Sequence, residues 1–158
     1  MSGNATFNLS DTALVSVAHV DAPEVVPSSR FDEILADTYE RVGAQPGLLE
    51  SLAGIKERRW WPEAYLFTDA AAAAGEKAIA ASGVRVDDIG LLIDTSVCRD
   101  RLEPSSAVTV HNALELPSWC LNFDLSNACL GFVNALQLAG NMIESGQISY
   151  ALIVDGEG

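Results

Sequence analysis

One cysteine lies between a short apolar strand pattern and a long apolar helix pattern, where it could act as a nucleophile. Residues 121–125 have the character of a short buried strand. Ser126 and Asn127 favour a tight turn after it, and Cys129 would begin the helix. The first N–H groups of a helix lack intrahelical partners and lie at the positive end of its dipole, a setting that favours the nucleophilic thiolate. We therefore predict that Cys129 is a catalytic nucleophile with N–H groups nearby for an oxyanion; the alternative is a small buried structural cysteine.

The other cysteines and the two histidines do not suggest a second site. The three cysteines are widely spaced, without a CxxC pair or a Cys/His pair, so we expect neither a disulfide framework nor a metal site. Cys98 ends one predicted strand and Cys120 precedes another, which favours structural roles. His111 on a predicted helix and His19 in a predicted strand have no paired nucleophile, which favours packing or hydrogen bonding.

Composition and charge exclude several classes of protein. The chain has 158 residues, 49% of them hydrophobic, which is enough for one domain with a substantial core. Its net charge of −13 argues against binding to nucleic acid or to an anionic membrane surface. We see no signal peptide and no apolar run of transmembrane length. These features predict a soluble protein of a reducing, cytoplasmic compartment.

Strand and helix patterns alternate along the chain, which predicts an α/β fold with helices against a mixed sheet. Apolar patterns predict strands over residues 13–20, 90–97, 121–125 and 150–154, and helices over residues 30–42, 48–52, 70–82, 104–114 and 129–145. Serines 28 and 29 could cap the first helix and Gly83 could end the alanine-rich one. Residues 1–12 are expected to form a tail, which leaves residues 13–158 as the folded part.

The predicted helix over residues 129–145 is apolar around most of its circumference. Its polar residues form one narrow stripe: Asn134, Gln137, Asn141 and Glu144. A helix of this kind is buried on several sides, and one sheet cannot cover it. An isolated domain would then expose more contiguous apolar surface than soluble monomers usually tolerate, so we expect a partner surface on this helix.

Residues 127–134, Asn-Ala-Cys-Leu-Gly-Phe-Val-Asn, resemble the thiolase superfamily, in particular the β-ketoacyl synthase III-like condensing enzymes. The likeness is greatest to the branch that opens olefin and β-lactone biosynthesis by joining two acyl-CoA chains head to head. It runs from about Ala13 to the end of the chain but covers only the first half of such an enzyme. The resemblance implies a thiolase-like fold, N-terminal half, with the nucleophile helix buried between two sheets.

A second candidate site residue, Glu103, lies on the loop of residues 99–105, 26 residues before Cys129. The olefin branch has the same arrangement, and there the Glu of a Leu-Glu-Pro sequence reaches across a dimer interface and is proposed as a base. The fatty-acid initiation synthases carry an aromatic residue in that place. The resemblance therefore implies that Glu103 serves the Cys129 of a partner subunit.

The reaction implied by the resemblance is a condensation of two acyl-CoA molecules without decarboxylation. Cys129 would attack the first thioester to give an acyl-enzyme, and Glu103 of a partner would remove an α-proton from the second. In this family a His and an Asn from the second half assist, and neither His19 nor His111 lies in the matching motif. We therefore expect acyl-CoA substrates, no cofactor, a complementary C-terminal half or chain, and a dimeric assembly.

Two other functions remain open. A decarboxylating 3-oxoacyl-carrier-protein synthase III would use a malonyl-carrier substrate, although Glu103 argues against it. A non-catalytic interaction subunit would explain an absent second half, although the intact Cys129 turn argues against it.

A basic and aromatic segment over residues 54–62 also allows two interpretations. It holds Lys56, Arg58 and Arg59 beside Trp60 and Trp61. It could bind the anionic coenzyme A or a carrier protein, or it could be a solvated strand whose aromatic residues pack on a helix. The Trp and Arg that bind the coenzyme's adenine in the initiation synthases are absent upstream, so we assign no coenzyme-binding residues.

Overall fold

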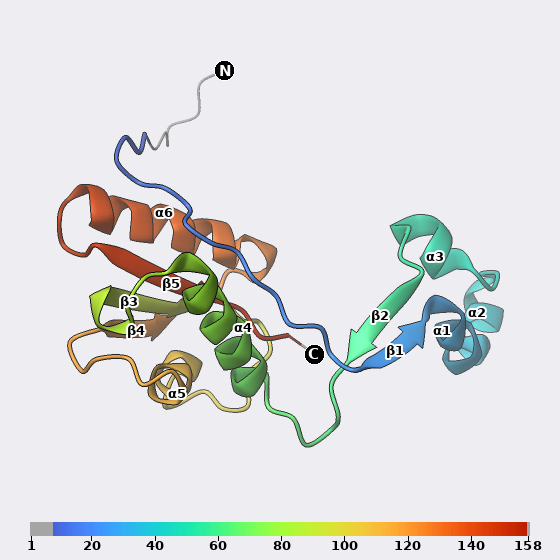
Figure 1. Ribbon diagram of the computed structural model, residues 1–158. Coiled ribbons are helices and arrows are strands. Elements are labelled where there is room, and N and C mark those ends of the chain that lie inside the picture. Colours follow the sequence, from blue (N-terminus) through green and yellow to red (C-terminus); the bar gives the residue numbers. More distant parts are fainter. Residues whose placement is uncertain (1–7, 158) are drawn as a thin grey trace. The chain divides into compact units, whose positions relative to one another are not determined.

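The structure is a computed structural model that describes residues 8–157 (Figure 1). Residues 21–64 form one compact unit, and the described residues before and after them form a second, larger unit. The larger unit holds Cys129, Glu103 and the three parallel strands of the chain. No helix within the described residues is both long and apolar enough to cross a membrane.

The core of the larger unit is a parallel sheet with the strand order β4-β3-β5. The central strand β3 (Ile89–Asp94) lies between β4 (Leu121–Asp124) and β5 (Tyr150–Val154). A strand buried on both faces needs a continuous apolar run, and Leu91, Leu92 and Ile93 of β3 are fully buried. These three strands match the strands predicted over residues 90–97, 121–125 and 150–154.

Helices cover both faces of this sheet (Figure 1). Helices α4 (Phe67–Ser82) and α5 (Ser106–Ala113) lie on one face, and α6 (Gly131–Glu144) lies on the other. Successive side chains of a strand point to opposite faces, so Leu92 packs with the α4 and α5 side while its neighbours Leu91 and Ile93 pack under α6. The larger unit is therefore a layered α/β structure, as predicted, although its three strands are parallel where a mixed sheet was expected.

Small residues let α4 lie close to its neighbours. A side-chain carbon at Gly75 would be 3.1 Å from Leu114 Cδ1 and 3.2 Å from Val154 Cγ1. Gly83, at φ +70°, ends the helix as predicted, while the start at Phe67 is earlier than expected. The short 3₁₀ helix η1 (Val86–Asp88) then leads into β3.

The predicted first strand over residues 13–20 is wrong, because the segment has no paired strand in the structure. It runs past α6 and α4 (Figure 1). Two hydrogen bonds join it to α4, and each involves one side chain. Ser16 Oγ donates to the carbonyl of Ala78 at 2.8 Å, and Lys77 Nζ donates to the carbonyl of His19 at 2.8 Å. Alternating side chains favour an extended backbone, but a strand also needs a neighbour for its N–H and C=O groups.

The predicted tail over residues 1–12 lies partly outside the described residues. Its described part lies against the C-terminal half of α6. Thr12 Oγ1 donates to Glu144 Oε1 at 3.0 Å, and the side chain of Leu9 occupies the space beside Gly140. This stretch therefore covers part of the helix that was expected to need a partner.

The smaller unit is a two-stranded antiparallel ribbon with three short helices. Strand β1 (Glu24–Pro27), which the sequence patterns did not predict, pairs with β2 (Glu57–Trp60). The helices are α1 (Ser28–Ile34), α2 (Ala36–Val42) and α3 (Leu48–Ala53), and α3 matches its prediction.

The single helix expected over residues 30–42 is instead two helices separated at Leu35. Hydrogen bonds of α-helical spacing continue through this residue, so the chain bends there rather than unwinding. Ser28 does not cap the helix as expected. Its hydroxyl donates to the carbonyl of Ile55 and accepts from Arg58, which ties the helix to β2 and to the residues just before it.

Candidate active site

Cys129 is exposed on the connection between β4 and α6. It lies in the 3₁₀ helix η2 (Ala128–Leu130), and α6 begins at Gly131, two residues later than predicted. The N–H of Leu130 donates to the carbonyl of Asn127 at 3.0 Å, which closes the turn around the cysteine. The structure thus confirms the strand–turn–helix placement, with the cysteine in the turn.

The backbone just before Cys129 is strained. Ala128 has a φ of +45°, a left-handed conformation that residues with a side chain rarely adopt. Such a conformation costs on the order of 1–3 kcal/mol and concentrates at functional sites, where the surrounding structure imposes it. Asn127 Nδ2 donates to Asn134 Oδ1 at 2.7 Å, a bond that spans η2 and the first turn of α6. Strained strand-to-helix turns expose nucleophiles in some α/β enzymes.

Gly131 allows α6 to begin directly against the ends of two strands. A side-chain carbon there would be 3.2 Å from the carbonyl oxygen of Leu125 and 3.3 Å from that of Thr95. Both distances are shorter than most such contacts, and neither oxygen belongs to a side chain that can rotate away. The absence of a side chain at Gly131 therefore fixes how close the cysteine turn lies to the sheet.

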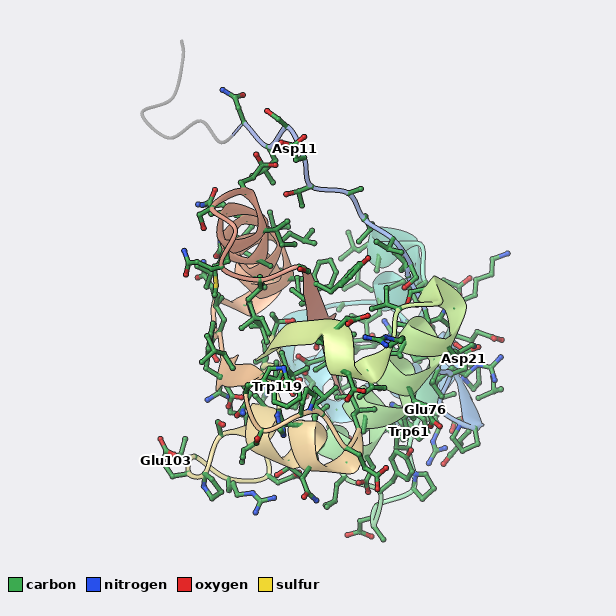
Figure 2. All side chains as sticks on the ribbon, turned by 60° about the vertical axis from the view of Figure 1, so that its left-hand side comes forward. Asp11, Asp21, Trp61, Glu76, Glu103 and Trp119 are labelled. Atoms are coloured by element: carbon green, nitrogen blue, oxygen red, sulfur yellow. The ribbon has the colours of Figure 1, made fainter. Side chains whose placement is uncertain are left out.

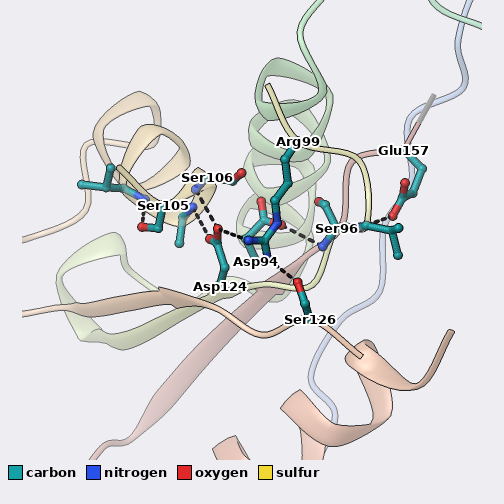
Figure 3. A network of polar contacts seen from close by, with 11 residues as sticks. Asp94, Ser96, Arg99, Ser105, Ser106, Asp124, Ser126 and Glu157 are labelled. Carbon is teal, nitrogen blue, oxygen red and sulfur yellow. Dashed lines mark hydrogen bonds and ion pairs between the residues drawn. The ribbon is translucent and has the colours of Figure 1, made fainter. Parts of the chain in front are cut away.

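A polar network joins the carboxyl ends of β3 and β4 to the segments that follow them (Figure 3). Asp124, the last residue of β4, accepts hydrogen bonds from the N–H groups of Ser106 at 2.9 Å and Ala107 at 2.8 Å. Arg99 Nη1 lies 3.5 Å from Asp124 Oδ2, and Arg99 Nη2 donates to Ser126 Oγ. One aspartate thus caps α5 while one arginine contacts the turn that leads to Cys129.

A second group of carboxylates fixes the start of the loop after β3. Burial raises the pKa of Asp94, whose Oδ1 accepts the N–H of Ser96 at 2.8 Å while Oδ2 has no hydrogen-bond partner. Burial and the neighbouring Glu157 raise the pKa of Asp155 to about 6. Burial also disfavours the ionised form of Glu157. Hydrogen bonds to its carboxylate, including those from the N–H groups of Val97 and Cys98, outweigh the effect of burial, so the pKa of Glu157 is lowered.

Glu103 is exposed on the loop between β3 and α5. Figure 2 shows it at the outer end of this loop, directed away from the sheet. Within residues 8–157, no hydrogen bond or ion pair joins it to Cys129. The structure therefore does not bring the two predicted site residues together in a single chain.

The other cysteines and the two histidines lie outside the Cys129 turn. His111 Nε2 lies 3.1 Å from the carbonyl oxygen of Pro117, which confirms a hydrogen-bonding role. Cys120 is buried, and burial raises the pKa of its thiol, which disfavours the thiolate. Cys98 is half-buried, and His19 is exposed on the segment that is not a strand. The part of the chain that the structure describes has no group of three or more His, Cys, Asp or Glu that could hold a metal ion.

An open hollow of about 530 Å³ lies between α4 and α5. Asp69, Glu76 and Glu115 line it together with alanines and other apolar residues. It contains neither Cys129 nor Glu103, so it belongs to a different part of the surface from the candidate site.

Sequence reasoning missed the Arg99, Asp124 and Ser126 contacts. One signal was present, because Asp124 is a charged residue at the end of a predicted strand. The carboxyl ends of parallel strands meet at one edge of a sheet, where such residues often serve a site.

The sequence of this chain is similar to those of two kinds of condensing enzyme. A family model described as 3-oxoacyl-[acyl-carrier-protein] synthase III matches residues 123–158, which include the cysteine turn. An acyl-CoA:acyl-CoA alkyltransferase from Xanthomonas campestris is 43% identical over 93% of this chain and 44% of the relative. A β-ketoacyl-[acyl-carrier-protein] synthase III from Ehrlichia chaffeensis is 38% identical over 66% of this chain and 32% of the relative.

Solved structures of the same two kinds of enzyme also match this chain. An OleA variant from Xanthomonas campestris has a TM-score of 0.87 and 42% identity, covering 94% of this chain and 43% of its own. A 3-oxoacyl-(acyl carrier protein) synthase III from Xanthomonas oryzae has a TM-score of 0.87 and 42% identity, covering 94% and 44%. The chain spans less than half the length of each of these proteins.

Proposed function

We propose that this chain is an acyltransferase with Cys129 as nucleophile. The chain has the thiolase-like fold, and its sequence is similar to that of the N-terminal part of a β-ketoacyl synthase III-like condensing enzyme. The proposed reaction is the non-decarboxylative Claisen condensation of two long-chain acyl-CoA molecules to a β-keto product. The observation that carries the proposal is the exposed Cys129 on a strained turn, in a chain 43% identical to an acyl-CoA:acyl-CoA alkyltransferase.

The first half of the proposed reaction takes place at the Cys129 turn, with an acyl-CoA thioester as substrate. The Cys129 thiolate attacks the carbonyl carbon of an acyl-CoA, the bond from that carbon to the coenzyme's sulfur breaks, and coenzyme A leaves as a thiolate that takes up a proton. Exposure of Cys129 gives a bulky thioester access to the sulfur. The turn fixed by Gly131 and by the bond between Asn127 and Asn134 keeps the sulfur in one place during the attack.

The second half needs a base that the same chain does not place beside Cys129. Glu103 of a partner subunit removes the α-proton of a second acyl-CoA, and the resulting enolate carbon attacks the Cys129 thioester. A carbon–carbon bond forms, the bond to the Cys129 sulfur breaks, and a β-ketoacyl-CoA leaves. The exposed position of Glu103 at the outer end of its loop supports a role toward another subunit (Figure 2).

A decarboxylating 3-oxoacyl-carrier-protein synthase III is the second candidate. The family model at residues 123–158 and several relatives carry that name. Among the sequence relatives, the alkyltransferases are more similar, at 43% and 40% identity over at least 90% of this chain. The two solved structures, one of each name, are both 42% identical and do not separate the two reactions. Carbon–carbon bond formation with acyl-CoA alone, without a malonyl substrate, separates the two reactions.

The proposal includes a complementary polypeptide and a dimeric assembly. The relatives extend well beyond the part matched here, and the proposed chemistry also needs a His and an Asn to stabilise the enolate. One face of α6 packs on the sheet through Ala135 and Ala139, but Phe132 and Val133 of its first turn are exposed. A complementary half that covers this turn would remove an apolar surface from water. We place the activity in the cytoplasm, where free cysteines persist.

The test of the reaction is mass spectrometry after incubation with a long-chain acyl-CoA, alone and with malonyl-CoA. An acyl adduct on Cys129 and a β-keto product without malonyl-CoA are expected. Product only with malonyl-CoA would support the decarboxylating synthase, and no adduct with any thioester would support a non-catalytic subunit.

The test of the assembly is size-exclusion chromatography with light scattering on the chain expressed alone and with any chain that co-purifies with it. Aggregation alone and recovery with the partner are expected. A monodisperse, folded monomer near 16.8 kDa would contradict the need for a complementary half.

A further inference from the structure

The loop of Glu103 and the turn of Cys129 are connected through one side chain, that of Arg99. Arg99 lies on the β3–α5 loop four residues before Glu103, and Ser126 lies three residues before Cys129. The guanidinium contacts both Asp124 and Ser126 (Figure 3). We propose that Arg99 is a positioning residue that couples the Glu103 loop to the Cys129 turn, an inference that rests on the proposed function of these two residues.

The two terminal nitrogens of the Arg99 guanidinium contact two different residues. Nη1 lies near the carboxylate of Asp124 and Nη2 donates to the hydroxyl of Ser126. The planar guanidinium has several donors in fixed directions, whereas a lysine ammonium is a single compact charge. A lysine at position 99 can keep the ion pair with Asp124, but it cannot hold both partners in this geometry.

The ion pair of Arg99 with Asp124 is more buried than an ordinary surface pair. The Asp124 side chain is 8% exposed and the Arg99 side chain 23%, compared with 40% for Asp88 and 74% for Arg85 in a surface pair. Charges removed from water interact more strongly and are screened less by salt. The carboxylates of Asp94, Asp124 and Glu157 surround the same loop, and Arg99 is the positive side chain that the described contacts place among them.

The same network also fixes the far end of the Glu103 loop. Asp124 accepts the N–H groups of Ser106 and Ala107, directly after the loop, so one carboxylate holds the first turn of α5 and the guanidinium together. A displacement of the Ser126 turn would therefore be transmitted through Arg99 and Asp124 to both sides of Glu103. This geometry predicts reciprocal coupling: loosening the turn loosens the loop, and loosening the loop loosens the turn.

The test compares Arg99→Lys and Ser126→Ala with Arg101→Lys as the matched control. Arg101 lies on the same loop, but its guanidinium contacts Thr109 of α5 at 3.2 Å. Amide hydrogen exchange is measured by mass spectrometry in the active assembly, over residues 97–105 and over residues 125–131. Ser126→Ala should raise exchange in the Glu103 loop, Arg99→Lys should raise it in the Cys129 turn, and Arg101→Lys should change neither segment relative to the unmodified protein.

A kinetic measurement separates positioning from general stabilisation. Arg99→Lys should lower kcat for condensation about tenfold to a hundredfold with KM for acyl-CoA nearly unchanged, since misplacement of a reacting group by about 1 Å has effects of this size. Adding Ser126→Ala to Arg99→Lys should cause little further loss, because both remove the same contact. Unchanged exchange in both segments, or a loss shared equally by Arg101→Lys, would overturn the proposal. An unmodified protein without condensing activity would overturn the proposed function instead, and the exchange experiment would still decide the coupling.

Discussion

The turn that carries Cys129 and the loop that carries Glu103 begin at the same edge of one sheet, but the structure holds them very differently. The turn is short and tightly packed: Gly131 lies against two carbonyl oxygens, and Ala128 is held in a strained conformation. The loop is longer, and Glu103 is exposed at its outer end. A nucleophile must be fixed before the substrate arrives, whereas a base that serves another subunit must extend outward. The difference therefore agrees with the two proposed roles.

The largest expected effect comes from removing the cysteine. Cys129→Ala should abolish formation of the β-keto product, because no other group in the turn can form the thioester intermediate. Product formation is measured with long-chain acyl-CoA, and adducts are located by mass spectrometry. An acyl group found on Cys98 or Cys120 in this variant would contradict the assignment.

The next largest effect separates the two half-reactions. Glu103→Gln should leave acylation of Cys129 largely intact but lower condensation about 10²- to 10⁴-fold, the usual contribution of a general base. The acylation rate is measured in a single turnover and the condensation rate at steady state. Asp100→Asn, an exposed neighbour on the same loop, is the control and should change neither rate. Equal losses in both half-reactions would make Glu103 structural.

A smaller effect tests the tight packing of the turn. Gly131→Ala should destabilise the protein by about 1–3 kcal/mol, because the added carbon meets carbonyl oxygens that cannot move independently of the backbone. Gly140→Ala on the same helix is the control: the added carbon meets the flexible end of Leu9, and alanine favours the helix. Denaturant unfolding of the assembled protein measures both, and equal stability of the two variants would show that the close approach at Gly131 is unimportant.

The smallest expected effect concerns the carboxylates at the end of β5. The folded protein raises the pKa of Asp155 to about 6 from an ordinary value near 3.8, so folding favours its protonated form. This residue therefore reduces the free energy of unfolding as the pH rises from about 4 to 6, and the cost is complete above pH 6.

Asp155→Asn removes that cost, so the stability of the variant relative to the original protein should increase between pH 4 and pH 7. Urea unfolding at both pH values measures the change. A relative stability that is constant or falls with pH would show that Asp155 does not titrate in this way.

Prediction from sequence succeeded for the helices and strands that are defined by the residue pattern of a single segment. The apolar runs of β3 and β5, the alanines of α4 and the periodicity of α6 each define an element without reference to a distant residue. The same patterns placed Cys129 in a strand-to-helix turn. They failed for residues 13–20, whose alternation is real but whose backbone lies beside side chains and helices rather than beside a strand.

The sequence alone determined the strands β3, β4 and β5, the helices that cover them and the position of Cys129 between β4 and α6, because burial periodicity and turn chemistry act over a few neighbouring residues. Only the tertiary structure decided that Arg99 reaches Asp124 and Ser126, partners about 25 residues away, and that Glu103 is directed away from the sheet at the outer end of its loop. It also decided that Ala128 adopts a positive φ. These features depend on where strands end relative to one another in the sheet, and a local pattern carries no information on distances between segments that meet only when the chain is folded.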